Sequence, residues 1–185
     1  MQSSVSEYPL HCASQSGNLD FVKYFISIGN DIEAKQWDGS TPLLEAIKSN
    51  RLEVVKYLIS IGADIKVKDK DGNTPLILAS ENGHLEVVKY LISIGANKEA
   101  KDKFGNTPLI SASRYCKLEV VKYLTSVGAN IEAKDNNGTT PLIHASLRHE
   151  CDIARFLISV GANKNAIDND GRTVSEYMKS IDTSD

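Results

Sequence analysis

The chain repeats itself every 33 residues, and no other feature of the sequence limits the possible folds so strongly. The segment NTPLILAS at 73–80 returns as NTPLISAS at 106–113. The segment LEVVKYLISIGA at 52–63 returns unchanged at 85–96, and the same register continues in both directions without an insertion. A fixed period of this length is typical of a solenoid, in which each unit buries its apolar face only by stacking on its neighbours.

Each unit predicts two short helices and a turn that leads to the next unit. A Thr-Pro pair begins the first helix, because Thr accepts hydrogen bonds from free backbone N–H groups and Pro fits the first helical position. Gly95 provides the left-handed end of a second helix, and Asp71-Gly72 predicts a tight hairpin-like turn. The second helix has one apolar face, formed by Leu85, Val88, Leu91 and Ile92.

The period, the Thr-Pro-Leu start, the LEVVKYL helix and the Gly-Ala step together resemble the ankyrin repeat family. The resemblance implies an all-α ankyrin repeat solenoid of stacked helix-turn-helix units with hairpin-like turns, and a single domain over 1–185. The partial sixth repeat is either a C-terminal half-cap or the point where a longer protein was divided. The expected repeats are 3–35, 36–68, 69–101, 102–134 and 135–167, followed by the partial repeat 168–185.

The chain departs from the family pattern at two positions of the repeat. The histidine of Thr-Pro-Leu-His occurs only as His11, and apolar packing is expected where the other repeats have Leu44, Ile77, Ile110 and Ile143. The glycine that ends the first helix is replaced by Asn50, Cys116 and His149. Asn tolerates the left-handed conformation, so we expect strain at Cys116 and His149. We also expect Cys116 to lie at an exposed helix end, as the reactive thiol.

Charge and composition argue against several classes of protein. A net charge of −3 disfavours non-specific binding to nucleic acid or to an anionic membrane, since both need a basic excess. The N-terminus shows no signal-peptide pattern, and the longest apolar runs are too short to span a bilayer. Three cysteines without regular spacing predict no disulfide framework. We therefore expect a cytoplasmic monomer, with a nuclear location also possible.

No group of residues predicts catalysis. No Ser, Cys, Asp or Glu recurs beside a positioned base, and the sequence has no glycine-rich phosphate loop. His144, His149 and Cys151 are close in sequence, but their spacing matches no zinc pattern. Cys151 also takes the place of a leucine in the other repeats, which favours a small buried side chain. We therefore expect neither enzyme activity nor a cofactor or metal.

The positions that differ among the repeats fall in two rows, one at the turn tips and one at the end of the first helix. In the ankyrin family these rows line the concave face, so the resemblance implies a module that binds another protein there. Helices about 8–10 Å apart give six units a strip of roughly 50 Å, enough for about 800 Å² of interface. The candidate partner-binding residues are Trp37, Lys70, Lys103, Phe104, Arg114, Tyr115, Leu147 and Arg148.

Trp37 is the strongest single candidate, because Trp, Tyr and Arg dominate binding hot spots and a turn tip gives a Trp no core role. The alternative is that its ring packs on a neighbouring repeat. Lysines 35, 68, 101 and 134 form a row beside the turns, and we interpret this row and the carboxylates near it as a self-compensated ladder. A structural spacer, an inhibitory domain, a fragment of a larger ankyrin protein and a nucleic-acid binder remain open, since fold does not fix function.

Overall fold

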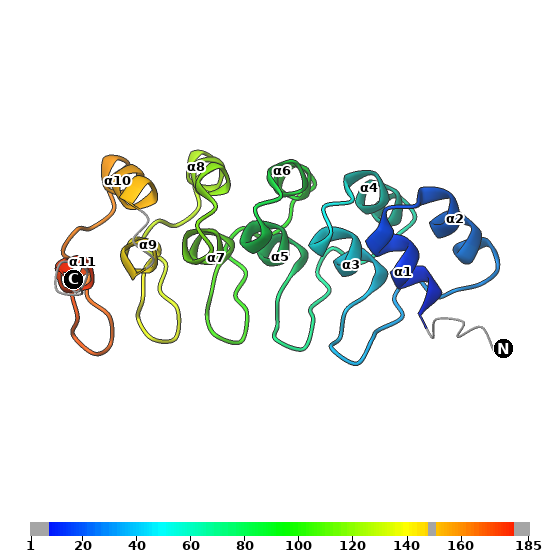
Figure 1. The fold of residues 1–185 in the computed structure, drawn as a ribbon, viewed down its shortest axis with the longest axis horizontal. Coiled ribbons are helices and arrows are strands. Elements are labelled where there is room, and N and C mark those ends of the chain that lie inside the picture. The colour runs from blue at the N-terminus through cyan, green and yellow to red at the C-terminus, as the bar shows by residue number, and fades with distance from the viewer. Residues whose placement is uncertain (1–7, 148–150, 180–185) are drawn as a thin grey trace, which may run out of the picture.

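The computed structural model describes residues 8–147 and 151–179, which form a row of short helices (Figure 1). Arg148 and His149, both named above, lie outside the described residues. Within these ranges there is no strand, and the one isolated bridge joins Ile167 to Thr173. The helices are α1 (Pro9–Ser16), α2 (Leu19–Ser27), α3 (Pro42–Lys48), α4 (Leu52–Ser60), α5 (Pro75–Asn82), α6 (Leu85–Ser93), α7 (Pro108–Arg114), α8 (Leu118–Ser126), α9 (Pro141–Leu147), α10 (Cys151–Ser159) and α11 (Val174–Lys179).

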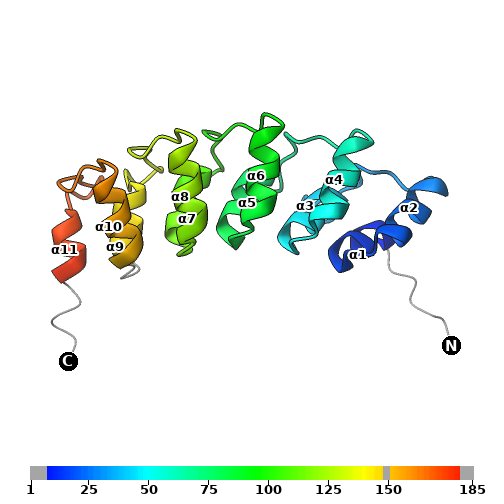
Figure 2. The same ribbon diagram turned by 90° about the horizontal axis from the view of Figure 1, so that it is seen from above.

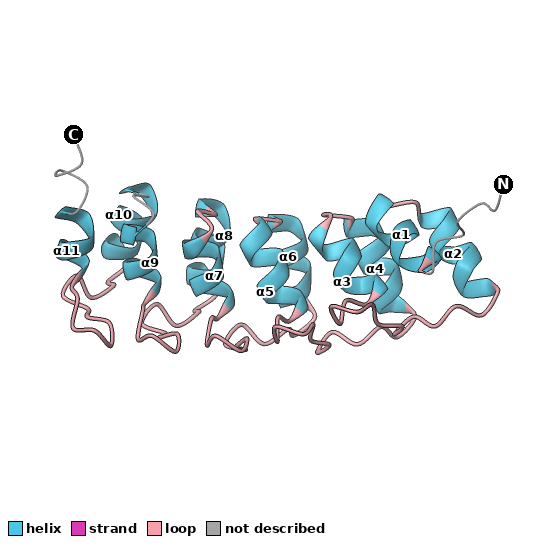
Figure 3. Ribbon diagram, turned by 60° about the horizontal axis from the view of Figure 1, so that its bottom comes forward, coloured by secondary structure: helices cyan, strands magenta, loops and turns pink. Residues whose placement is uncertain are grey.

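The helices form two layers along one gently curved row (Figures 1 and 2). The odd-numbered helices make one layer and the even-numbered helices α2 to α10 make the other, while the long turns project from one edge (Figure 3). We number the repeats by their helix pairs, so that repeat 1 contains α1 and α2. Packing between repeats is dense in the odd layer and sparse in the even layer. These repeating helix pairs confirm the predicted all-α solenoid.

Threonine side chains begin the first helix of each inner repeat, as the Thr-Pro pairs predicted. The Thr41 hydroxyl accepts a hydrogen bond from the backbone N–H of Leu44, and Thr74, Thr107 and Thr140 make the equivalent bond at 3.3 Å. Repeat 1 has Tyr8 at this position and no side-chain cap. The cap satisfies a donor that would otherwise be orphaned at the helix start, and is worth about 1 kcal/mol.

The first helices of repeats 1 to 4 end with a residue of positive φ. Asn50 has a φ of 57° and Cys116 a φ of 62°, where repeats 1 and 3 have Gly17 and Gly83. The left-handed conformation costs an ordinary side chain roughly 1–2 kcal/mol, so the expected strain at Cys116 is found. The expected exposure of Cys116 is wrong, because the residue is half-buried and packs against the core. Cys12 is an exposed cysteine instead.

One apolar core runs through the stack, and the same positions of successive repeats supply it. The leucine of each second helix is fully buried in four repeats, as Leu58, Leu91, Leu124 and Leu157. Apolar packing at the former histidine position is confirmed, since Leu44, Ile77, Ile110 and Ile143 have no exposed surface. In repeat 1 the His11 Nε2 atom lies 2.9 Å from the carbonyl of Ala34 and 3.1 Å from that of Ser40. His11 thus joins repeat 1 to the first turn.

Candidate functional site

An aspartate at the base of each turn after the first holds the turn in shape. One oxygen of Asp102 accepts hydrogen bonds from the backbone N–H groups of Phe104 and Asn106, both at 2.8 Å. The other oxygen accepts a bond from the side-chain amide of Asn106 at 2.8 Å. Asp69, Asp135 and Asp168 bind the backbone of their own turns in the same way. These carboxylates are therefore occupied within their turns.

The first turn has Gln36 in place of this aspartate, and a different network holds it. Asp38 accepts hydrogen bonds from the backbone N–H of Ser40 at 2.9 Å and from its hydroxyl at 2.7 Å. The ammonium of Lys48 lies 3.2 Å from Asp38 and 3.1 Å from Glu45. Burial acts to raise the pKa of Asp38, but the bonds from Ser40 and Lys48 outweigh it and lower this pKa to about 2. Burial acts to lower the pKa of Lys48, but Glu45 and Asp38 raise it.

The tips of neighbouring turns are joined by backbone hydrogen bonds. The N–H of Lys70 donates to the carbonyl of Asp38, and the N–H of Lys103 donates to that of Asp71, both at 2.9 Å. The same bond recurs at 2.9 Å from Asn136 to Phe104 and from Asn169 to Asn137. The side chains at the tips are therefore carried on a frame that is fixed from one repeat to the next.

Three lysines of the row, Lys68, Lys101 and Lys134, form a second connection between repeats, and our interpretation of these three as part of a charge ladder is wrong. The ammonium of Lys68 donates to the backbone carbonyl of Lys101 at 3.0 Å, and Lys101 donates to that of Lys134 at 2.8 Å. Lys134 continues the series to the carbonyl of Ile167 at 3.3 Å. Each of these lysines is thus engaged by the next repeat rather than by an interleaved carboxylate.

Large apolar side chains remain exposed at the candidate positions. The exposed fractions of Trp37, Phe104, Tyr115 and Leu147 are 79%, 58%, 47% and 40%. The ammonium of Lys70 lies 5.9 Å from the centroid of the Trp37 ring, and the high exposure of this ring places it outside the core. An exposed aromatic ring on a rigid turn is suited to enter a pocket on another molecule.

Two neighbouring cavities lie between the turn tips and the ends of the first helices. The first has a volume of about 270 Å³ and is lined by Asp71, Glu81, Phe104, Arg114 and Tyr115. The guanidinium of Arg114 lies 5.8 Å from the centre of the Tyr115 ring. Burial, followed by the charges of Asp69 and Asp102, raises the pKa of Glu81 to about 6, against the smaller effect of Lys48 and Arg114. The cavity is therefore acidic in character with aromatic walls.

The second cavity, of about 450 Å³, continues the first toward the C-terminal end. Arg114 lines both cavities, and Leu147, Asp170 and Arg172 line the second. His144, considered above as a metal ligand, lies at this cavity with its Nε2 atom 3.0 Å from the Asp135 carboxylate. Within residues 8–147 and 151–179 no three His, Cys, Asp or Glu side chains come together as a metal site.

The structure thus brings together four of the candidate residues predicted from the sequence: Phe104, Arg114, Tyr115 and Leu147. Trp37 and Lys70 form a separate pair at the tips of the first two turns, Lys103 is exposed at a tip, and Arg148 is not described. The candidate residues chosen from the sequence did not include Glu81, a wall of the first cavity, or Arg172, a wall of the second. Glu81 does belong to the variable row at the end of the first helix, in the position equivalent to Lys48 and Arg114, so its place in the repeat was the signal that could have selected it.

Stacked helix pairs that display variable side chains on a fixed, repeated frame define a solenoid repeat protein. A family model described as ankyrin repeats, in three copies, matches residues 1–69, 60–135 and 94–168. The chain belongs to the ankyrin repeat family. No curated protein matches it. Among the described residues, no helix is sufficiently long and apolar to cross a membrane.

Proposed function

We propose that this chain is a non-catalytic module that binds another protein through its display surface. We define the display surface as the variable turn tips and first-helix ends that carry Trp37, Lys70, Lys103, Phe104, Arg114, Tyr115 and Leu147, together with Arg148 from its place in the sequence. Ankyrin repeats generally serve as protein interaction modules, which supports the proposal. The proposal includes an intracellular location and a monomeric chain.

The observation that carries the proposal is the exposure of four large apolar side chains on turns and helix ends that are held by repeated hydrogen bonds. Trp37 is 79% exposed although its turn is fixed by the Asp38 network and by the bond from Lys70. Burying such side chains against a partner removes apolar area from water at about 25 cal/mol per Å². Because the frame is already ordered, binding loses little conformational entropy.

The charge of the surface indicates what the partner should carry. Glu81 and Asp71 line the first cavity beside the rings of Phe104 and Tyr115, and a basic side chain would meet both the carboxylates and the aromatic walls. In the second cavity Arg114 and Arg172 lie beside Asp135, Asp168 and Asp170, and Arg172 pairs with Asp170, so this cavity suits a polar group of no net charge. We therefore propose a partner segment in which a basic group and a neutral polar group flank an apolar anchor.

The experiment is a capture of partners from cell lysate with the wild-type chain and with the variant Trp37→Ala/Tyr115→Ala/Arg148→Ala. The matched control is Tyr24→Ala/Arg155→Ala, which removes an exposed aromatic ring and an exposed arginine from the second helices. Circular dichroism first checks that all three proteins have the same helical content. The expected result is a protein that the wild type and the control capture and the triple variant loses.

Two other outcomes would count against the proposal. A partner retained by the triple variant and lost by the control would move the interface to the second helices. The absence of any partner specific to the wild type would favour a structural spacer. In either case the display surface would not be the binding site.

A further inference from the structure

A glutamate of one repeat accepts a backbone hydrogen bond from the next repeat at three of the four interfaces between full repeats. The donor is the N–H group of the second residue after the glycine that follows each second helix. This bond attaches the loop after one second helix to the equivalent loop of the next repeat. The bonds run to Glu33 from Asp64 at 2.8 Å, to Glu99 from Asn130 at 2.9 Å and to Glu132 from Asn163 at 2.8 Å.

The interface between repeats 2 and 3 is the exception. Lys66 stands where the other repeats have glutamate, and Asn97 is the residue opposite. A lysine ammonium has three donors and no acceptor, so it cannot replace the glutamate. Among residues 8–147 and 151–179, no acceptor is found for the backbone N–H of Asn97, and no hydrogen bond or ion pair for the Lys66 ammonium. Two donors therefore face this interface and nothing in it accepts from them.

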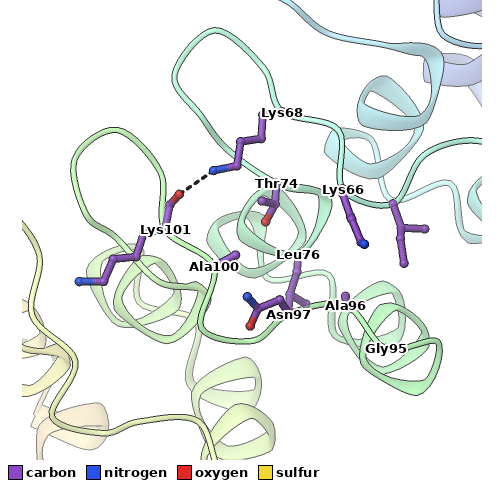
Figure 4. A pocket seen from close by; sticks show the side chains of 10 residues that line it. Lys66, Lys68, Thr74, Leu76, Gly95, Ala96, Asn97, Ala100 and Lys101 are labelled. Atoms are coloured by element: carbon purple, nitrogen blue, oxygen red, sulfur yellow. Dashed lines mark hydrogen bonds between the residues drawn. The ribbon is translucent and has the colours of Figure 1, made fainter.

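A cavity of about 340 Å³ lies at this place (Figure 4). Lys66 and Asn97 line it together with apolar surface from Ile65, Leu76 and Ala96. Lys68, on its rim, is already engaged, because its ammonium donates to the carbonyl of Lys101 at 3.0 Å. The ammonium of Lys66 and the backbone N–H of Asn97, together with the side-chain amide of Asn97, are thus donors that a ligand in the cavity would meet.

The equivalent groove between repeats 3 and 4 shows what chemistry fits. It is lined by Glu99 and Asn130, and there the chain's own carboxylate accepts the backbone N–H of Asn130. The loop geometry that receives a carboxylate is therefore repeated along the protein. Only at the interface of repeats 2 and 3 has the carboxylate been exchanged for a positive charge.

We propose that the cavity between repeats 2 and 3 binds a carboxylate on an apolar stem. The carboxylate accepts the N–H of Asn97, as glutamates do at the other interfaces, and pairs with the ammonium of Lys66. The stem lies against Ile65, Leu76 and Ala96. Because the pairing is near the surface and a single N–H is involved, binding of a small acid falls in the millimolar range.

The test is a titration of the ¹⁵N-labelled full chain with butyrate, followed by the amide resonance of Asn97 at constant ionic strength. Butyramide is the matched ligand control, since it has the same stem and no charge. We expect a saturable downfield shift of the Asn97 amide with butyrate and a shift at least about tenfold smaller with butyramide. The absence of a saturable shift with butyrate, or an equal response to butyramide, would overturn the proposal.

A pair of variants separates a specific site from general attraction to positive charge. Lys66→Glu supplies the carboxylate from the chain itself, so its Asn97 amide should resonate downfield without ligand and respond about tenfold less to butyrate. Lys164→Glu makes the same change of charge on an exposed loop lysine and should leave the butyrate response unchanged. Full response in Lys66→Glu, or equal loss in both variants, would refute the assignment.

The source of the carboxylate is tested with two further probes. N-acetylalanine presents the carboxylate of a chain terminus, and the α-amide of N-acetylglutamate presents that of a side chain. Either probe that binds more tightly than butyrate, with the same loss in Lys66→Glu, supports the site and identifies a protein partner as its source. Weaker binding of both than of butyrate supports the site for a small organic acid.

Discussion

Removing the carboxylate of Asp102 tests whether the turn aspartates hold the display surface. Asp102 accepts three hydrogen bonds at 2.8 Å, from the N–H of Phe104 and from the N–H and side-chain amide of Asn106. A hydrogen bond to a charged group contributes about 1.5–3 kcal/mol when buried, and partial exposure of the turn reduces this. We expect Asp102→Ala to lower the free energy of unfolding by about 2 kcal/mol in total.

The assay is urea unfolding followed by circular dichroism, with the thermal midpoint as a second measure. For a chain of this length about 2 kcal/mol corresponds to a decrease of roughly 4–8 °C in Tm. Asp71→Ala is the matched control, because Asp71 lies on the preceding turn, is exposed and has no side-chain hydrogen bond among the described residues. A change in the free energy of unfolding below about 0.5 kcal/mol for Asp102→Ala, or equal changes for both variants, would refute this reasoning. The turn carboxylates would then act only as solvated charges beside the lysine row.

Four further predictions concern stability. Leu91→Ala should lower the free energy of unfolding by about 2–5 kcal/mol in urea titrations, because it truncates a fully buried side chain. Cys116→Gly should raise it by about 1 kcal/mol, since glycine adopts a φ of 62° without strain. Glu81 has a raised pKa, so ionising it should destabilise the fold. As the pH rises from about 4.5 to above 6, the free energy of unfolding of the wild type should fall by about 1 kcal/mol relative to that of Glu81→Gln, measured by unfolding at several pH values. Asp38 has a lowered pKa, so its ionised carboxylate should stabilise the fold fully above pH 3.8, and this stabilisation should be lost as the pH falls through about 2. Acid unfolding should therefore show a smaller loss of stability in this pH range for Asp38→Asn than for the wild type.

The sequence predicted the features that local chemistry determines. The threonine caps and the glycine turns depend on residues three or four apart in the sequence. The capping role of Thr74 and the left-handed conformation of Gly95 could therefore be predicted from the sequence alone. The exposure of Trp37 also followed, because a turn tip leaves a large ring without a core to enter.

The sequence did not predict contacts that join one repeat to the next. The bond from Lys68 to the carbonyl of Lys101 spans 33 residues. Its acceptor is a backbone carbonyl, which every residue type has, so the sequence does not show which residue accepts the bond. Cys116 was expected to be exposed because it ends a helix, yet it is half-buried and packs against the core. The first cavity of the display surface is lined by side chains from two repeats and the second by side chains from three, so the residues that line them could be identified only from the stacked structure.

The backbone bonds between turn tips have an elastic consequence. Each tip is joined to the next at 2.9 Å, whereas the second helices on the opposite side of the row are packed sparsely. A solenoid that is bound along one edge and loose along the other bends about the bound edge. We therefore expect thermal bending or an applied load to open the spaces between the even-numbered helices first, while the distance between neighbouring turn tips stays constant. The edge with the turn tips would then be stiff, and the edge with the second helices would be elastic.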